Sequence, residues 1–97
     1  MIVGFGDKGT HDVFDGTDSK DARRVLPKHL WGVAHRKLDA LNATHDLMDL
    51  ASLPSNRLEK LKGNLAGYWS IRVNDQYRVI FTFGNGNADH VQIVDYH

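Results

Sequence analysis

Hydrophobic residues in the first half of the chain recur every three or four positions, the spacing of one face of an α-helix. A short helix is predicted from Asp18 or Ser19, both good N-cap residues, to Leu26. Because proline is best tolerated in the first turn of a helix, Pro27 indicates a second helix, which we place at about residues 27–41. The apolar face of that helix is formed by Leu30, Val33, Ala34, Leu38 and Leu41.

The segments beside these helices have weaker patterns. Residues 2–5 are a short apolar run that is typical of an edge strand, and the polar residues 7–20 indicate a loop with room for one helical turn. A further short helix is predicted at residues 44–50, with Thr44 as its cap. Pro54 then ends the helical half of the chain.

After Pro54 the hydrophobic period changes to two, which predicts strands at residues 68–73, 77–83 and 90–96. Residues 74–76 and 85–87 are rich in turn-forming residues, so consecutive strands are expected to pair as antiparallel hairpins. Residues 57–62 are predicted to form one more strand, before a turn at residues 63–67. The expected fold is therefore α+β, with N-terminal helices packed on the apolar face of a twisted antiparallel sheet.

Length and composition agree with an ordinary globular protein. At 97 residues the chain is long enough for one domain, residues 1–97, but too short for two independent cores. It has no apolar run that could span a membrane and no N-terminal secretory pattern, so we expect a cytoplasmic protein without a membrane partner.

Residue types limit the chemistry. Cysteine is absent, and the histidines show no metal-binding spacing, so we expect neither a metal site nor a cofactor. The formal net charge is zero, which argues against a protein that coats nucleic acid. Residues 57–78, however, contain five basic residues against two acidic ones, and this local excess suits a site for one phosphodiester. The basic residues are Arg57, Lys60, Lys62, Arg72 and Arg78.

Several motifs in the second half of the chain occur in a recognisable order. The stretch NRLEKLKGNLAGYWSIRVNDQYRVIFTF contains an L-x-x-L-x-G element and then a Y-W-S-I-x-V-N hairpin, and the chain closes on IVDYH. In these features it resembles the HigB-type branch of the RelE superfamily of mRNA interferases, the toxins of type II toxin–antitoxin systems. The resemblance extends over nearly the whole chain, but its specific part is the second half.

The resemblance implies a RelE-like fold and cleavage of translated mRNA in the A site of the 70S ribosome, which inhibits translation and growth. It also implies a HigA-like helix-turn-helix antitoxin as partner, with operator DNA bound only through that antitoxin. RNA cleavage without a metal uses the 2′-hydroxyl of the substrate as nucleophile. The enzyme must then supply a base, an acid and fixed positive charge.

The D-Y-H ending supplies three candidates. His97 can give or take a proton near neutral pH, and its own carboxylate and Asp95 favour the imidazolium, so it is the candidate acid. Tyr96 shares the strand alternation of Gln92 and Val94, and its ring is expected to stack on a base or to approach the phosphate. Asp95 is a candidate RNA-site residue that would orient an imidazole or a cation.

Four further candidates come from the preceding motifs. Arg72 and Arg78 belong to the set of strand positions that alternates with the core, so their guanidinium groups are expected to share one face and bind a phosphate. Lys62 resembles the lysine of the family's L-x-x-L-x-G element. Glu59 occupies a position where many relatives have histidine, so it either acts as the general base or pairs with Lys60 or Lys62.

Each candidate also has a structural interpretation: a frayed terminal histidine, a sheet aromatic, or solvated surface charges. Two rival functions remain open at this stage. One is a non-catalytic interaction module or a translation inhibitor that acts without cleavage. The other is a ribonuclease that needs no ribosome, which we do not expect because the chain lacks the overall positive charge to hold RNA unaided.

Overall fold

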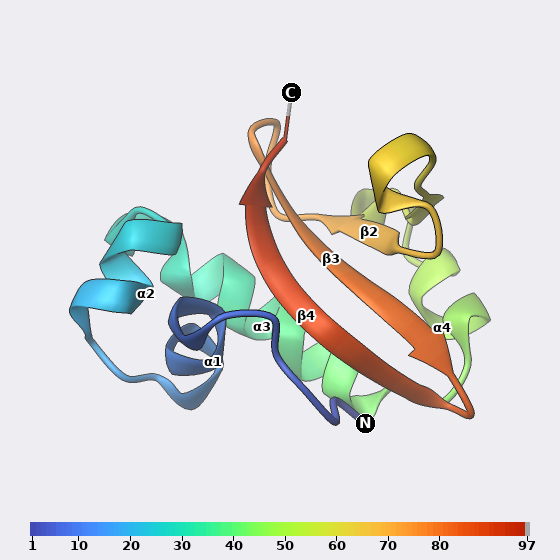
Figure 1. Cartoon of the computed structure of the whole chain (residues 1–97), viewed down its shortest axis with the longest axis horizontal. Helices are drawn as coiled ribbons and strands as arrows, with labels where there is room; N and C mark the ends of the chain where they lie inside the picture. The colour runs from blue at the N-terminus through green and yellow to red at the C-terminus, as the bar shows by residue number, and fades with distance from the viewer. Residues whose placement is uncertain (97) are drawn as a thin grey trace.

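The computed structural model describes residues 1–96, in which helices pack on one face of a four-stranded antiparallel sheet (Figure 1). The α+β class predicted from the sequence is confirmed. In chain order the elements are α1 (Lys8–Asp15), α2 (Lys20–Val25), η1 (Lys28–Leu30), α3 (Trp31–Ala43), α4 (Leu47–Ala51), η2 (Pro54–Asn56), β1 (Glu59–Lys60), η3 (Gly63–Leu65), β2 (Trp69–Arg72), β3 (Tyr77–Gly84) and β4 (Asn87–Asp95).

Helix α1 contradicts the predicted loop at residues 7–20. Asp7 caps the helix by accepting a hydrogen bond from the Thr10 amide at 2.6 Å, and Gly16, at φ 75°, ends it in the left-handed conformation. Gly9 allows close packing on α2, because a Cβ there would lie 2.5 Å from the Asp21 carbonyl oxygen. The helix was missed because caps and a glycine contact define it, and it contains too few apolar residues to show a period.

The next helices are confirmed with shifted boundaries. Ser19 caps α2 as predicted, by accepting a hydrogen bond from the Ala22 amide at 3.0 Å. The helix expected at residues 27–41 begins with the 3₁₀ turn η1 and continues as α3. Thr44 is not the cap of α4: it ends α3, where its hydroxyl donates to the Ala40 carbonyl at 2.8 Å. Asp46 caps α4 instead.

The strand order β1-β2-β3-β4 follows the chain, and every neighbouring pair is antiparallel. The predicted hairpins are therefore confirmed. The predicted edge strand at residues 2–5 forms two isolated parallel bridges to β4, through Ile2 and Phe5. The strand predicted at residues 57–62 is only two residues long, because Arg57 is left-handed at φ 44° and Lys62 leads directly into η3.

The sheet has a core face and an open face. Ile71, Val79 and Ile93 are paired across β2, β3 and β4, and they pack in one hydrophobic cluster with Leu38 and Leu41 of α3. In Figure 1, α3 passes behind the sheet, so the face toward the viewer, which we call the open face, carries the two arginines of β2 and β3. Ser70 and Ile80 lie on the same face but are themselves buried.

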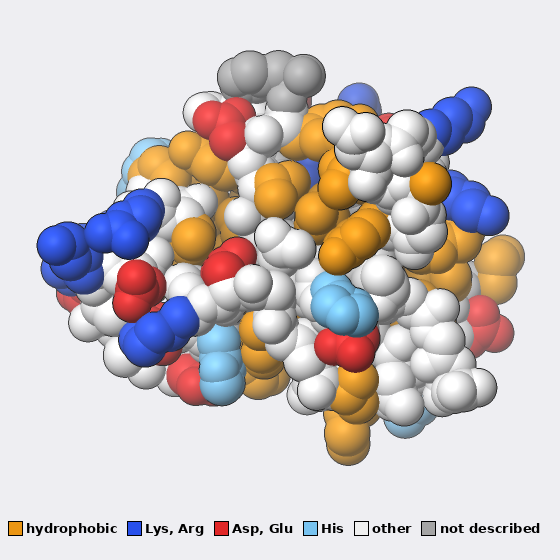
Figure 2. Space-filling view, in the orientation of Figure 1, with side chains coloured by type: hydrophobic (Ala, Val, Ile, Leu, Met, Phe, Trp, Pro, Cys, Tyr) orange, Lys and Arg blue, Asp and Glu red, His pale blue; other side chains and the backbone are white. Residues whose placement is uncertain are grey.

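The space-filling view shows how charge is distributed on this open face (Figure 2). Lysine and arginine side chains gather at the two sides of the view, whereas the middle, over β3 and β4, carries mostly apolar and uncharged groups. None of the helices in the described part of the chain is long and apolar enough to cross a membrane.

Candidate functional site

Two arginines face each other at the end of the sheet where β2 turns into β3. Arg72 and Arg78 are direct cross-strand partners, so their side chains leave the same face, as predicted. The turn between them is held by Asn74, whose side-chain oxygen accepts hydrogen bonds from the amides of Gln76 at 2.9 Å and Tyr77 at 2.8 Å. Like charges directly opposite in a sheet repel, and a bound anion would relieve that repulsion.

Arg78 is more deeply buried than Arg72. Its side chain is 12% exposed, and its Nη1 lies 3.9 Å from Glu59 Oε1, beyond hydrogen-bond distance. Its Nε and Nη1 are buried without a hydrogen-bond partner among residues 1–96. A buried, unpaired donor is costly, and two on one guanidinium indicate a site that an acceptor such as a phosphate oxygen completes.

Arg72 lies at the outer edge of the site. Its side chain is 28% exposed and forms an ion pair with Asp75 in the turn. Lys37 approaches from α3 and donates to the side-chain oxygen of the buried Asn56 at 2.5 Å. Burial, followed by repulsion from Arg72 and Arg36, lowers the pKa of Lys37 below its usual value of 10.5. Positive charge therefore extends from the sheet toward α3.

The end of the chain is fixed to the same turn. The Tyr96 amide donates to the Gln76 carbonyl at 2.7 Å, and Gln76 Nε2 donates to Asp95 Oδ2 at 3.0 Å. The Tyr96 ring centroid lies 5.5 Å from Arg78 Cζ, so the ring is on the open face, as its alternation predicted. His97, the predicted acid, lies outside the described residues.

Glu59 contacts Arg78 of the site, whereas Lys62 forms no ion pair with a site residue among residues 1–96. Glu59 is paired with Ser70 across β1 and β2, is half exposed, and has its ionic contact with Arg78. The expected alternative of a Glu59 pair with Lys60 or Lys62 is not observed, because the Lys60 ammonium lies over the Trp69 ring at 5.9 Å. Lys62 is exposed at the start of η3, without an ion pair in the described part of the chain.

Sequence reasoning missed three polar residues near this site. The Ser70 hydroxyl is buried without a partner among the residues described, on the same face as Arg78. Gln76 joins the turn to the C-terminal segment, and Lys37 adds a cation from α3. Ser70 could have been predicted from the sequence, since it alternates with the core positions of its strand in the same way as Arg72. The other two depend on contacts between distant segments, which no local pattern reveals.

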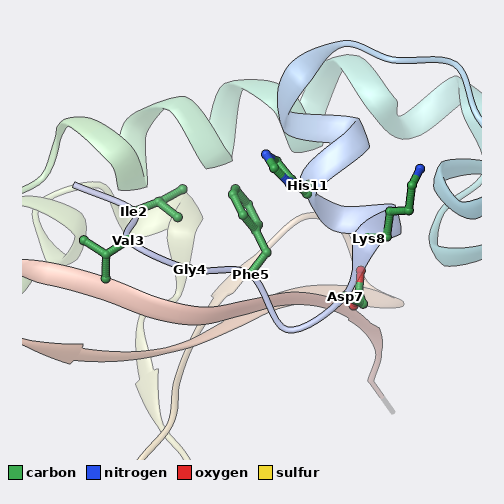
Figure 3. Close-up of a pocket in the computed structure, with 7 residues that line it drawn as sticks. All are labelled: Ile2, Val3, Gly4, Phe5, Asp7, Lys8 and His11. Carbon is green, nitrogen blue, oxygen red and sulfur yellow. The ribbon is translucent and has the colours of Figure 1, made fainter.

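A hollow of about 540 Å³ lies near the N-terminus, between residues 2–5 and α1 (Figure 3). Its polar groups are already engaged: Asp7 caps α1, and the Lys8 ammonium pairs with Asp12 at 2.6 Å. The rings of Phe5 and His11 stack there with centroids 4.5 Å apart. None of the residues that line this hollow has a buried side-chain polar atom without a partner in the described chain, whereas Arg78 and Ser70 on the sheet do, so we assign the candidate site to the sheet.

The arrangement at the sheet provides the parts that an anionic substrate requires. Arg78 and Arg72 supply fixed positive charge, Glu59 supplies a carboxylate beside it, and Tyr96 supplies a ring and a hydroxyl. These groups come from β1, β2, β3 and the segment after β4, so the antiparallel register sets their spacing. Such a site suits a phosphodiester whose cleavage needs proton transfer and charge stabilisation.

Comparisons with known proteins identify the family of this chain. Residues 4–97 match the model of a family described as the RelE-like toxin of type II toxin–antitoxin system HigB. Toxin HigB-1 of Vibrio cholerae is 41% identical over 88 residues, covering 91% of this chain and 90% of that protein. Endoribonuclease HigB of Proteus vulgaris is 30% identical over 102 residues, covering 100% of both chains.

Solved structures agree at the level of the fold. The YoeB–YefM complex of Staphylococcus aureus contains a chain with a TM-score of 0.60 at 18% identity, covering 100% of this chain and 98% of that one. The YoeB/ParE toxin of Agrobacterium tumefaciens gives a TM-score of 0.54 at 19% identity, with 100% of both chains covered. By sequence and by fold, the chain belongs to the HigB family of RelE-like toxins from type II toxin–antitoxin systems.

Proposed function

We propose that this toxin is an endoribonuclease that cuts translated mRNA in the ribosomal A site by attack of the substrate's own 2′-hydroxyl, without a metal. The observation that carries the proposal is the buried Arg78 guanidinium, with two donors unpaired in the described chain. The relative from Proteus vulgaris, which matches this chain along its full length, is named an endoribonuclease.

In the proposed mechanism, a base removes the 2′-hydroxyl proton, and the resulting oxyanion attacks the adjacent phosphorus. The bond from phosphorus to the 5′ oxygen then breaks, and an acid protonates that oxygen. The products are a 2′,3′-cyclic phosphate and a 5′-hydroxyl. Arg78 stabilises the extra negative charge on the phosphate as the transition state forms, because its donors are already fixed and desolvated.

The remaining roles follow from where the groups lie. Glu59 is the proposed base, because its carboxylate lies 3.9 Å from the Arg78 guanidinium and is half exposed, so a substrate hydroxyl next to the bound phosphate can reach it. His97 is the proposed acid, since its neighbour Tyr96 is held at the β2–β3 turn. Tyr96 is proposed to contact the nucleotide at the scissile phosphate.

Three further residues complete the proposed site. Arg72 holds a phosphate oxygen beside Arg78, and Asp95 orients the C-terminal segment through Gln76. Lys62 acts only if η3 or the RNA moves toward the sheet, because it is exposed and has no ion pair in the described chain. We therefore expect a smaller effect from removing Lys62 than from removing Arg78.

Dependence on the ribosome is supported by charge. Protein affinity for RNA without sequence contacts comes mainly from neutralised phosphates, and this chain has a formal net charge of zero. The positive charge at Arg72, Arg78 and Lys37 is enough to hold one or two phosphates but not a long strand. The ribosome would supply the remaining positioning.

Members of the family act within toxin–antitoxin pairs, and the YoeB relative from Staphylococcus aureus was solved as a complex with YefM. We propose that a small helix-turn-helix antitoxin of the HigA kind neutralises this toxin and that operator DNA is bound through that antitoxin. A reading frame for such a protein directly beside this one would support the pairing.

Primer extension on a message, during controlled expression of the toxin, tests the proposal. New 5′ ends inside the reading frame are expected when the message is translated, and none when its start codon is removed. An intact message with blocked translation would instead support an inhibitor that acts without cleavage. Cutting of purified RNA without ribosomes would show a ribosome-independent ribonuclease.

A further inference from the structure

We propose that Tyr68 and His90 form a nucleobase platform that receives a base of the RNA on the open face of the sheet. This inference rests on the proposed ribonuclease function and adds a residue-level account of substrate positioning. The platform is separate from the groups around Arg78, and the resemblance to the family assigns it no role.

The register places the platform on the same face as the arginines. Ser70 is paired with Ile80, next to the Arg72–Arg78 pair. Tyr68 is two residues before Ser70, and its carbonyl accepts a hydrogen bond from the Leu61 amide at 2.9 Å, so the sheet continues to this position. On β3, Thr82 is two residues beyond Ile80 and is reached by the same alternation.

A strained backbone presents His90. Ile80 is paired with Gln92 and Thr82 with Asp89, so β4 contains one residue more than β3 in this interval and forms a bulge. His90 lies in the bulge at φ 52°, in the left-handed region, which is uncommon for residues other than glycine, although histidine, asparagine and aspartate adopt it more often than most. The Asp89 side chain stabilises it by accepting from the His90 amide at 2.7 Å. Backbone strain of this kind is often retained where it positions a functional side chain.

The two rings form a surface that is only partly covered. The His90 side chain is 60% exposed, its Nδ1 is 3.1 Å from the Thr82 hydroxyl, and its ring centroid is 6.5 Å from that of Tyr68. The ring planes meet at 60°, which is an edge-to-face pair. Tyrosine and histidine rings are the usual stacking partners of unpaired RNA bases.

Charge favours a base here and not a phosphate. A carboxylate oxygen of Asp89 lies 3.9 Å from His90 Nδ1, and a carboxylate repels a phosphate. A hollow of about 380 Å³ lies next to Thr82 and Asp89, the two residues that contact His90, and neither ring lines it; its other lining residues include Asn85 and Asn87. Its amide and carboxylate groups can bond to the edge of a base. The middle of the face in Figure 2 is likewise mostly apolar and uncharged.

The separation suits a nucleotide beyond the cleavage point. Thr82 is four residues from Arg78 along β3, which at about 3.3 Å per residue is roughly 13 Å. A phosphate at Arg78 and a base at the platform therefore belong to different nucleotides of one strand. The platform would hold the codon in register with the site and contribute to its base preference.

The test is cleavage of a message on purified, programmed ribosomes by the full-length toxin and matched variants. Tyr68→Leu removes the ring but keeps an apolar side chain, Tyr68→Phe keeps the ring, and His90→Asn keeps a residue that tolerates positive φ. We expect Tyr68→Leu to lower kcat/KM roughly 5- to 150-fold, the range of one base–aromatic stack, and Tyr68→Phe to lower it less than about 3-fold. His90→Asn is expected to fall between them.

Messages with an abasic nucleotide at each codon position in turn complete the test. At one position the abasic message should be cut equally by the unmodified toxin and by Tyr68→Leu, because the stacking partner is gone. The inference is overturned if Tyr68→Leu cuts the normal message at the unmodified rate, or if its defect is the same on every abasic message. If the unmodified toxin cuts nothing on ribosomes, the proposed function itself fails and the platform with it.

Discussion

Replacement of Arg78 by methionine should abolish cleavage and at the same time stabilise the free toxin. The guanidinium is 12% exposed, and two of its nitrogens have no hydrogen-bond partner in the described chain. Each buried donor left unpaired costs roughly 1–3 kcal/mol. Repulsion from Arg72, directly opposite, adds to that cost. Methionine fills a similar volume without either penalty.

The contacts that methionine would lose are smaller. The interaction of Arg78 with the Tyr96 ring contributes about 0.5–2 kcal/mol. The ion pair with Glu59, which is half exposed and has a separation of 3.9 Å, contributes about 0–1 kcal/mol. Two unpaired donors together cost roughly 2–6 kcal/mol and the lost contacts contribute roughly 0.5–3 kcal/mol, so the net expectation for Arg78→Met is a gain of about 2 kcal/mol in the free energy of unfolding. For a chain of this size each 1 kcal/mol raises Tm by roughly 4–8 °C.

Urea unfolding of the purified toxin without its antitoxin measures this directly, with tryptophan fluorescence as the signal. Arg24→Met is the matched control, because Arg24 is an exposed helical arginine whose nearest carboxylate oxygen is at 3.8 Å, and its free energy of unfolding should change by less than about 0.5 kcal/mol. A loss of more than about 2 kcal/mol in Arg78→Met would refute the reasoning, since the guanidinium would then be a structural group.

Three further predictions test other parts of the account. Leu38→Ala, in the fully buried face of α3, should lower the free energy of unfolding by about 2–5 kcal/mol in urea, and a loss below about 1 kcal/mol would contradict the assigned core. The Lys8 hydrogen bond lowers the pKa of Asp12 below its usual 3.8, so the Asp12 carboxylate stabilises the fold above pH 3.8. This contribution disappears as the pH falls through the lowered pKa. The difference in free energy of unfolding between the toxin and Asp12→Asn should therefore shrink in unfolding curves recorded from pH 7 to pH 2. His97→Gln should relieve growth arrest on expression without lowering Tm, and full toxicity of a well-expressed His97→Gln protein would remove this residue from the mechanism.

The sheet and its open face were predictable because they depend on local alternation. Trp69, Ile71 and Val73 alternate with Ser70 and Arg72. Successive side chains of a strand point to opposite faces, so burying the apolar set on the core face places the other set on the opposite face. The same parity put Arg72 and Arg78 on one face, which the structure confirms. Tyr96 followed from the alternation of β4.

Other features depend on contacts that no local pattern encodes. Helix α1 is stabilised by the Asp7 cap and by the approach of Gly9 to α2, not by an apolar stripe. Glu59 contacts Arg78, not Lys60 or Lys62 as one alternative predicted, because β1 is paired with β2. The bulge that presents His90 comes from a one-residue mismatch between β3 and β4, and residues 88–92 contain no glycine or proline that would have predicted it.

Cleavage on programmed ribosomes, with a message that carries a single 2′-deoxynucleotide at the mapped cut, tests the central claim most directly. The account predicts that the unmodified message is cut by the toxin only when ribosomes are present, that Arg78→Met leaves it intact, and that the 2′-deoxy message resists both proteins. Equal cutting of the 2′-deoxy message would contradict attack by the substrate's hydroxyl, and unimpaired cutting by Arg78→Met would place the catalytic site elsewhere in the protein.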